Sequence, residues 1–433
     1  MNKEKRPETA HTGTFVQMND MAPTLQSKQP VLTTIDGHQD LPRYFRQAYA
    51  RASLLNKGRL DVVMPDGRKF RVDGAAPGYV AELHVHDPDL FGRLIREGDV
   101  GFAESYMEGG WSTPDLQAFM DLINDDNPSV YDEAVGMRLV RLVERARHWL
   151  RSNSKTQARK NISYHYDLGN DFYGLWLDDS MTYSSAIFST GQESLEAAQE
   201  AKYCAMVDRM GVKPGDHVLE IGCGWGGFAE YAAAKRGLKV TALTISAAQR
   251  EYAIARMERS GLSDQVEIRM QDYRDTEGHF DGIASIEMFE AVGEKYWPRY
   301  FKSVFQRLQP GARAAIQIIM VPDERFNSYR NHVDFIQKYI FPGGMLGAPR
   351  PVREIAEKQG LEYVTTHDFG QSYSETLRRW NQTFQTRWPE IESLGYDARF
   401  KRMWEFYLTS CAGAFRSGTC DVTQLVLQKP KTQ

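Results

Sequence analysis

The stretch VLEIGCGWGG, Val218 to Gly227, decides the fold. Its first residues have the apolar pattern of a buried strand, and the following loop places Gly222, Gly224 and Gly227 in the spacing G-x-G-x-x-G. Glycines allow the backbone to approach a ligand at points where a side chain would collide. The residues GGFAEYAAAKRG have a helical pattern that ends in a C-cap glycine. Strand, glycine loop and helix together predict a ligand-binding turn in an α/β domain.

Strands and helices alternate after this turn. KVTALTIS, VEIRMQDY, FDGIASIEM and ARAAIQIIMV have strand patterns, whereas AAQREYAIARMERSG and EKYWPRYFKSVFQRLQPG have helical ones. This alternation predicts a parallel sheet flanked by helices, and such sheets bind ligands at the carboxyl ends of their strands. Glu287 and Glu290, in IEMFEAVG, follow one strand directly and have apolar neighbours. Carboxylates are rarely buried without a partner or a task, so we expect a functional site at this end.

The acids around the glycine loop distinguish between two cofactors. A dinucleotide site has an acid roughly 20 residues beyond the glycines, at the end of the second strand, to hold a ribose hydroxyl. The second strand here ends Thr244-Ile245-Ser246 without an acid, which disfavours a nicotinamide oxidoreductase. Glu220 instead precedes the glycines, and Asp272 follows the third strand. This E-x-G-x-G-x-G pattern resembles the class I S-adenosylmethionine (SAM) methyltransferases, and the resemblance implies that Asp272 binds the adenine amino group.

An aromatic-rich segment, NISYHYDLGNDFYGLWLDDSMTYSSAIF, lies ahead of the predicted sheet between Asn161 and Phe188. Part of it is expected to pack in the core. Together with VLEIGCGWGGFA, TALTISAAQ, QDYRD, MFEAVG and KYIFPGG, this segment resembles the cyclopropane-fatty-acyl-phospholipid synthases and the related mycolic acid cyclopropane synthases. The resemblance extends from about Asn161 to the C-terminus. It implies a class I methyltransferase (Rossmann-like) fold, and the additional N-terminal part suits the phospholipid-acting branch.

The resemblance also implies roles for individual residues. Tyr183 and Ser184 would hold the amino-acid end of SAM. Glu290 would be the active-site acid, Tyr166 would face the reacting carbon, and Tyr373 would close the site. The remaining cofactor residues would be Glu220, Gly222, Gly224, Thr244, Ile245, Gln249, Asp272 and Tyr273.

The anion site of the family is altered in this sequence. Family members are understood to use a bound bicarbonate ion as base, held by the acid, a histidine, a cysteine and a tyrosine. Gln317 stands at the histidine position, Ser185 stands at the cysteine position, and Ala291 follows Glu290 where the family commonly has histidine. Gln and Ser still donate hydrogen bonds to an anion, although neither titrates near neutral pH. Glu287 matches no functional position of the family, and an ordinary hydrogen-bonded role is expected for it.

The predicted function is SAM-dependent transfer of a methyl or methylene group to the double bond of an unsaturated fatty acyl chain in a membrane phospholipid. If the altered residues are neutral substitutions, the product is a cyclopropane. If the proton is lost elsewhere, the product is a methyl-branched or methylene acyl chain. A small-molecule N- or C-methyltransferase is disfavoured by the N-terminal part of the chain. A lipid-binding protein without catalysis is disfavoured by the intact glycine loop, Asp272, Glu290 and Tyr373.

Four segments are predicted along the chain. The polar start lacks periodicity and suits a disordered tail. A small lipid-associated α+β domain follows, with a β-hairpin around a turn at Pro65 to Gly67. A basic linker helix leads from it to the SAM-dependent catalytic domain. The predicted bounds of the four segments are 1–38, 39–135, 136–160 and 161–433.

The linker helix is distinguished by its charge. Between Arg138 and Lys160 the sequence has eight Lys or Arg residues against the single acid Glu144. A solvated helix packed on the core and a basic amphipathic helix on anionic lipid heads both fit this pattern. The predicted action on lipid favours the second interpretation.

The overall composition bears on partners and compartment. The formal net charge of -4 over 433 residues does not suggest nucleic-acid binding. No apolar run approaches the roughly 18–20 residues of a membrane span, and the first residues lack the apolar core of a signal peptide. The four cysteines have neither metal-ligand nor redox spacing, which suits a reducing cytoplasm. We expect a metal-free cytoplasmic protein at the inner face of the membrane, as a monomer or homodimer.

Overall fold

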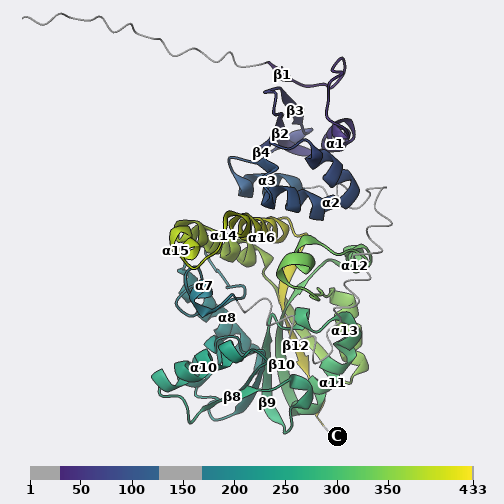
Figure 1. Cartoon of the computed structure of the whole chain (residues 1–433). Coiled ribbons are helices and arrows are strands. Elements are labelled where there is room, and N and C mark those ends of the chain that lie inside the picture. The colour runs from purple at the N-terminus through teal and green to yellow at the C-terminus, as the bar shows by residue number, and fades with distance from the viewer. Residues whose placement is uncertain (1–29, 126–167, 432–433) are drawn as a thin grey trace, which may run out of the picture.

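The structure is a computed structural model that describes residues 30–125 and 168–431. It contains a small sheet near the N-terminus and a larger sheet that carries the glycine loop. A layer of C-terminal helices lies between the two sheets (Figure 1). The predicted linker helix 136–160, Tyr166 and residues 1–29 of the predicted tail lie outside the described residues.

The large sheet has seven strands in the order β11-β12-β10-β9-β6-β7-β8. β6 to β10 run parallel to one another, and β12 runs antiparallel to β10 and β11, so the predicted parallel α/β sheet is confirmed. β6 and β9 are neighbours although β7 and β8 separate them in sequence, and ligands bind at such a switch of direction. The strands are β6 His217–Ile221, β7 Lys239–Thr244, β8 Val266–Met270, β9 Phe280–Ile286, β10 Leu308–Met320, β11 Glu362–Asp368 and β12 Asp421–Gln428.

Helices cover both faces of this sheet (Figure 1). One apolar core lies under α8, α9 and α10, and a second lies under α11 and α13. Ser194 and Ser246 cap the N-termini of α8 and α10 through their side-chain oxygens. Helix α9 ends at the predicted C-cap glycine, Gly237, which has φ 65°. No helix in the described ranges is long and apolar enough to cross a membrane. The bounds are α8 Leu195–Met210, α9 Gly227–Arg236, α10 Ala247–Arg259, α11 Trp297–Arg307, α12 Asp323–Tyr329 and α13 Pro349–Lys358.

The layer between the sheets consists of α14 (Gly370–Thr386), α15 (Trp388–Ser393) and α16 (Ala398–Arg416), beside the short α7 (Asn170–Gly174). Its interior is aromatic. Trp176, Trp380 and Trp404 are fully buried there, and the rings of Trp176 and Trp380 meet edge to face. The aromatic residues that precede the large sheet therefore contribute to the core, as the sequence suggests for part of them.

The small sheet has the strand order β1-β3-β2-β4-β5. β2 and β3 form the predicted hairpin, and Gly67 in its turn has φ 88°. β1 pairs with β3, so the segment expected to be a tail up to residue 38 includes a short strand. The elements are β1 Val31–Leu32, α1 Phe45–Ala52, β2 Lys57–Val63, β3 Lys69–Asp73, β4 Ala76–Val85, α2 Asp89–Met107, β5 Trp111–Ser112 and α3 Leu116–Asn124.

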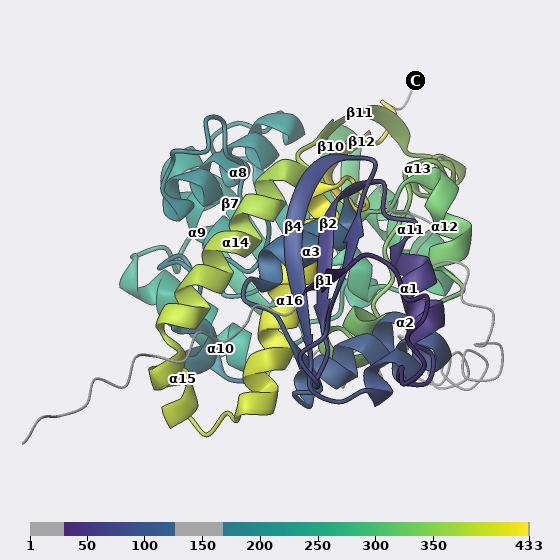
Figure 2. The same cartoon turned by 90° about the horizontal axis from the view of Figure 1, so that it is seen from above.

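Charged contacts fix the small domain on the helical layer. Viewed from above, the small sheet lies over α16 (Figure 2). Asp121 on α3 is 2% exposed and pairs with Arg378 on α14 and Arg416 on α16, at 2.5 and 2.9 Å. Glu104 on α2 pairs with Lys338 at 2.8 Å. Because breaking a buried ion pair leaves an uncompensated charge, these pairs hold the two domains in one arrangement.

Candidate active site

A cavity of about 570 Å³ opens at the carboxyl ends of β6, β7 and β9. One end of the cavity is formed by the glycine loop and by residues that follow β7 and β8. The other end is formed by aromatic and aliphatic side chains of α16 and of the small domain. All the residues predicted to hold the cofactor line it, namely Tyr183, Ser184, Glu220, Gly222, Gly224, Thr244, Ile245, Gln249, Asp272 and Tyr273.

The glycine loop leaves room for a ligand. Gly222 and Gly224 have φ of 86° and 52°, values that favour glycine. A Cβ added to Gly222 would lie 2.6 Å from the Cγ of Met288, whereas one added to Gly224 would have no heavy atom of the described residues within 4 Å. Beside the loop, Oε2 of Glu220 is buried without a hydrogen-bond partner among the described residues, and burial raises its pKa to about 8. An open backbone cradle next to an unsatisfied carboxyl fits a polar cofactor such as SAM.

The adenine side of the predicted site differs in one respect from expectation. Thr244, at the end of β7, donates to the side-chain oxygen of Gln249 at 3.1 Å. Both oxygens of Asp272 accept from Arg274, with distances of 2.7 Å to Nε and 2.6 Å to Nη2. Asp272 and Arg274 are 4% and 5% exposed, so they form a buried bidentate pair. The carboxylate expected to bind the adenine amino group is therefore already bonded within the chain.

A buried lysine lies next to the predicted amino-acid end of SAM. Nζ of Lys202 on α8 donates to Oγ of Ser184 at 2.7 Å, and burial lowers its pKa to about 7. The Tyr183 hydroxyl is 2.7 Å from that of Tyr407 on α16. Lys202 was not among the predicted site residues. The sequence indicates that Lys202 is buried only through its spacing: it lies four residues from Ala198 and from Met206, which are both on the buried face of α8.

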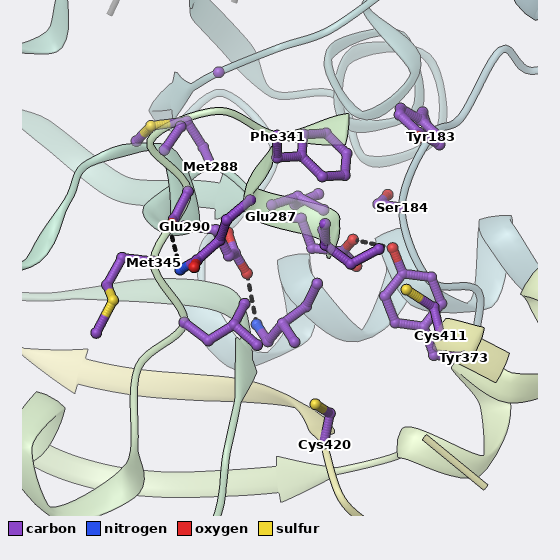
Figure 3. Close-up of a pocket in the computed structure, with 18 of the residues that line it drawn as sticks. Tyr183, Ser184, Glu287, Met288, Glu290, Phe341, Met345, Tyr373, Cys411 and Cys420 are labelled. Carbon is purple, nitrogen blue, oxygen red and sulfur yellow. Dashed lines mark hydrogen bonds between the residues drawn. The ribbon is translucent and has the colours of Figure 1, made fainter. Parts of the chain in front are cut away.

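Glu287 occupies the junction between the two ends of the cavity. It follows β9 with φ 48°, a left-handed conformation that is rare outside glycine. Its Oε1 accepts from the backbone N–H of Ser185 and from Nε2 of Gln317, both at 2.8 Å. Its Oε2 accepts from the hydroxyl of Tyr373 at 2.7 Å, as Figure 3 shows. The carboxylate is thus held by three donors from three separate parts of the chain.

Glu290 lies one turn further along and is held more weakly. Its Oε1 accepts from the backbone N–H of Ile319 at 2.6 Å (Figure 3). Its Oε2 is buried and has no partner among the described residues. Burial, and then the charge of Glu287, raise the pKa of Glu290 to about 8. This environment favours the protonated form of Glu290 near neutral pH.

The residues that match the family's anion site gather around Glu287. Gln317 and Tyr373 donate to its carboxylate, and neither bonds to Glu290. Ser185 contributes its backbone N–H, because its hydroxyl donates instead to the carbonyl of Ala186 at 2.9 Å. The hydrogen-bonded role expected for Glu287 is thus observed, but its donors are those expected to hold the anion. The sequence alone did not predict that these donors bind the carboxylate of Glu287.

Part of the cavity lining is mostly apolar and comes from both domains, although Asp99 and Asn124 of the small domain also line the cavity. Phe341, Leu377 and Phe406 line it from the catalytic domain. Phe102 on α2 and Ile123 on α3 line it from the small domain. An extended apolar chain is the kind of ligand that such a wall would accept.

The glycine cradle and the strand order define a class I SAM-dependent methyltransferase. The chain belongs to the family described as mycolic acid cyclopropane synthetase, which matches residues 153–425. It is 40% identical over 388 residues to tuberculostearic acid methyltransferase UfaA1 of Mycobacterium tuberculosis, a match that covers 85% of this chain and 87% of that protein. It is 38% identical over 392 residues to the cyclopropane-fatty-acyl-phospholipid synthase of Escherichia coli, covering 85% and 96%.

Solved structures agree with this assignment. The mycolic acid cyclopropane synthase CmaA1 in complex with SAH and CTAB has a TM-score of 0.59 and 29% identity, covering 63% of this chain and 98% of that chain. The cyclopropane synthase MmaA2 from Mycobacterium tuberculosis has a TM-score of 0.59 and 28% identity, with the same coverage. The protein is therefore a SAM-dependent methyltransferase of a lipid-modifying family, and the predicted fold is confirmed.

Proposed function

We propose that the protein transfers a methyl group from SAM to a double bond in an unsaturated fatty acyl chain of a membrane phospholipid. The observation that carries this proposal is the continuity of the cavity. The same space is bounded by the glycine cradle, by two buried carboxyl groups and by an apolar wall. Such a wall suits an acyl chain better than it suits the soluble amine of a small-molecule methyltransferase.

The residues present suit alkylation of a double bond. When bound, SAM supplies an electrophilic methyl group on a sulfonium ion. The double bond gives its π electron pair to that methyl carbon, the S–CH₃ pair stays on sulfur, and the other alkene carbon becomes a cation. Desolvated aromatic faces stabilise a cation by about 2 kcal/mol or more, and Tyr183, Phe341 and Tyr407 line the cavity. The cation then loses a proton to a base in the site.

The coverage of one relative supports a phospholipid as the substrate class. The Escherichia coli enzyme, whose name specifies a fatty acyl phospholipid, matches 85% of this chain. The mycolic acid enzymes match only 63% of it. The small domain, which supplies Phe102 and Ile123 to the cavity wall, begins well before the residues that the family match covers. We assign this domain to binding of the lipid.

The product is either a cyclopropane or a methyl-branched or methylene chain. Loss of the proton from the new methyl group closes a ring, which agrees with the family description. Loss of a proton from a chain carbon next to the cation leaves a methyl-branched chain with a double bond. A 1,2-hydride shift to the cationic carbon, followed by loss of a proton from the new methyl group, leaves a methylene group. This second candidate is favoured by the altered anion site, with Gln317 and Ser185, and by the match to a tuberculostearic acid methyltransferase.

Labelled SAM tests the proposal. Purified protein would be incubated with vesicles of unsaturated phospholipid and methyl-labelled SAM, and the acyl product identified by NMR. Ring protons establish cyclopropane formation, and a labelled methyl or methylene group establishes the second candidate. Transfer to a soluble amine with none to lipid would contradict the proposed function.

We further propose that the protein acts at the inner face of the membrane, held there by the predicted basic helix 136–160. The lipid substrate and the eight basic residues between Arg138 and Lys160 support this placement. Reversing the charge of Arg141 and Arg145 is expected to weaken sedimentation with anionic vesicles. Unchanged sedimentation would contradict a role for this segment.

A further inference from the structure

Glu287 has the geometry of an anion that the site is built to hold. Its carboxylate accepts from the Ser185 N–H, from Gln317 Nε2 and from the Tyr373 hydroxyl. These are the three positions that would hold a bicarbonate ion in the related synthases. A carboxylate and bicarbonate present the same planar pair of oxygens to hydrogen-bond donors. The Glu287 head group therefore takes up the donors that a bound anion would need.

We infer that Glu287 is the catalytic base of this enzyme: its carboxylate stands in place of a bound bicarbonate and removes the proton from the alkylated acyl chain. The inference rests on the proposed function for the identity of the reaction. It assigns the proton acceptor to a side chain of the protein and predicts a reaction that needs no bicarbonate.

The backbone conformation of Glu287 supports a functional role for its side chain. Glu287 has φ 48°, a conformation that glycine adopts freely and that is strained for other residues. Its N–H also donates to the carbonyl of Gln317 at 2.9 Å, so the strained conformation is fixed by the neighbouring strand β10. A long acidic side chain kept in a glycine-like conformation indicates that the carboxylate itself is needed at this point.

The charge distribution assigns the negative charge to Glu287 rather than to Glu290. Burial raises the pKa of both carboxyl groups. At Glu287 the Ser185, Tyr373 and Gln317 donors and the charge of Lys202 act in the opposite direction. Glu290 accepts from the backbone N–H of Ile319, its Oε2 has no hydrogen-bond partner among the described residues, and its pKa is raised to about 8. When two adjacent carboxyl groups differ in the number of hydrogen-bond donors that hold them, the one with more donors is ionised and can act as the base. The other one keeps its proton.

The proton transfer balances without another reactant. If a C–H bond of the new methyl group breaks, its electron pair bonds the methyl carbon to the cationic carbon and closes a ring. If a C–H bond on the neighbouring chain carbon breaks, its electron pair forms a double bond. The proton goes to an oxygen of Glu287, and it passes to water when the product leaves. Among the other carboxyl groups that line the cavity, Glu290 is one rival for this role, but its raised pKa favours its protonated form. His332 is a second rival, because its Nε2 has no partner in the described part of the chain.

The test compares Glu287→Gln and Glu287→Gly in buffer freed of carbon dioxide and in buffer with added bicarbonate. The wild-type enzyme is expected to have the same turnover in both. E287Q, which keeps the shape but not the basicity, is expected to lose about 10²–10⁴-fold in turnover in either buffer. E287G frees the three donors at a φ that glycine accepts, and bicarbonate is expected to restore its turnover at least about tenfold. Glu258→Gln, at an exposed position on α10, is the matched control with unchanged turnover.

A binding measurement supplies a second readout. With SAH bound, the ¹³C NMR line of labelled bicarbonate is expected to broaden with E287G and to stay sharp with wild-type protein. Calorimetry of SAH binding, with wild-type affinity in both variants, shows that each has folded. A wild-type enzyme that binds bicarbonate or depends on it would overturn the inference, as would an E287Q variant of full activity. Loss of turnover in His332→Ala or Glu290→Gln, with E287Q active, would reassign the base.

The NMR measurement uses no lipid. The inference about Glu287 can therefore fail while transfer to the acyl chain is observed. Equally, transfer to lipid can be absent while bicarbonate binds only to E287G, a result that would contradict the proposed function and support the replacement of the anion.

Discussion

The two ends of the cavity are built in different ways. The cofactor end is formed largely by backbone, because Gly222 and Gly224 lie within three residues and leave space by having no side chain. The end that removes the proton is formed by side chains from distant segments, with Ser185, Gln317 and Tyr373 converging on Glu287. The cradle leaves no room for a side chain at Gly222, whereas a side-chain network can lose members one at a time. The two ends should therefore respond differently to mutation.

The largest effect is expected at the cradle. Gly222→Val would place its Cβ 2.6 Å from Met288 Cγ, at φ 86°, so the loop has to move. We expect SAH affinity to fall at least about 100-fold, or roughly 3 kcal/mol, with no detectable methyl transfer. Calorimetry measures the loss. Gly211→Val is the matched control, since Gly211 also has a positive φ but has open space and lies away from the cavity. Equal losses in both variants would show that backbone strain alone is responsible.

An intermediate effect is expected at Tyr373. Tyr373→Phe keeps the ring, which packs 4.4 Å from that of Phe415, and removes one donor to Glu287. A hydrogen bond to a charged group contributes about 1.5–3 kcal/mol, so turnover should fall roughly 10–100-fold with SAH affinity unchanged. Because the lost donor favours the ionised form, the pKa of Glu287 should rise and the acidic limb of the pH–rate profile should move to higher pH. A shift to lower pH would exclude Glu287 as the titrating group.

A smaller effect is expected at Glu290 near neutral pH. The pKa of Glu290 is raised to about 8, so the folded state holds a proton that the unfolded state has lost between about pH 4.5 and 8. Its contribution to stability is therefore present at low pH and is lost as the pH rises through that window. Glu290→Gln, which resembles the neutral acid, should have near wild-type turnover at pH 7. In thermal melts from pH 5 to 9, the Tm of the variant should rise relative to that of the wild type as the pH increases. A constant difference in Tm across this range would contradict the raised pKa of Glu290.

The smallest effect on turnover is expected outside the two ends, at the domain contact. Asp121→Asn removes the charge that pairs with Arg378 and Arg416 and should cost about 1–3 kcal/mol in the free energy of unfolding. Urea unfolding measures this loss. Turnover at 25 °C should stay close to wild type, because Asp121 does not line the cavity. A large loss of turnover with unchanged stability would show that the contact controls the site itself.

The same contrast explains what could be predicted from the sequence. The cradle is contiguous, so its glycines, Glu220 and the strand–helix alternation predicted both the fold and the cofactor end. The resemblance named Gln317, Ser185 and Tyr373 but could not show that they bind Glu287, since this depends on the left-handed φ of that residue. The bidentate bond between Asp272 and Arg274 was also missed, because it depends on side-chain orientation after β8.

Other site features depend on tertiary packing. Lys202 is buried because α8 lies against the sheet, and only the neighbouring Ala198 and Met206 indicate this in the sequence. The contribution of Phe102 and Ile123 to the cavity requires the small domain to dock on α16, which no local pattern encodes. The predicted role of Tyr166 stays a prediction, since this residue lies outside the described ranges.

The shared wall of the cavity has an evolutionary consequence. The part of the cavity wall that we assign to the lipid is encoded partly in a different stretch of the gene from the residues around the glycine loop and Glu287. Substitutions at Phe102 or Ile123 can reshape the chamber without touching a residue that holds the cofactor or the carboxylates. If the small domain binds the lipid as we propose, changes in this domain alone could alter the lipid substrate while the cofactor end stays the same.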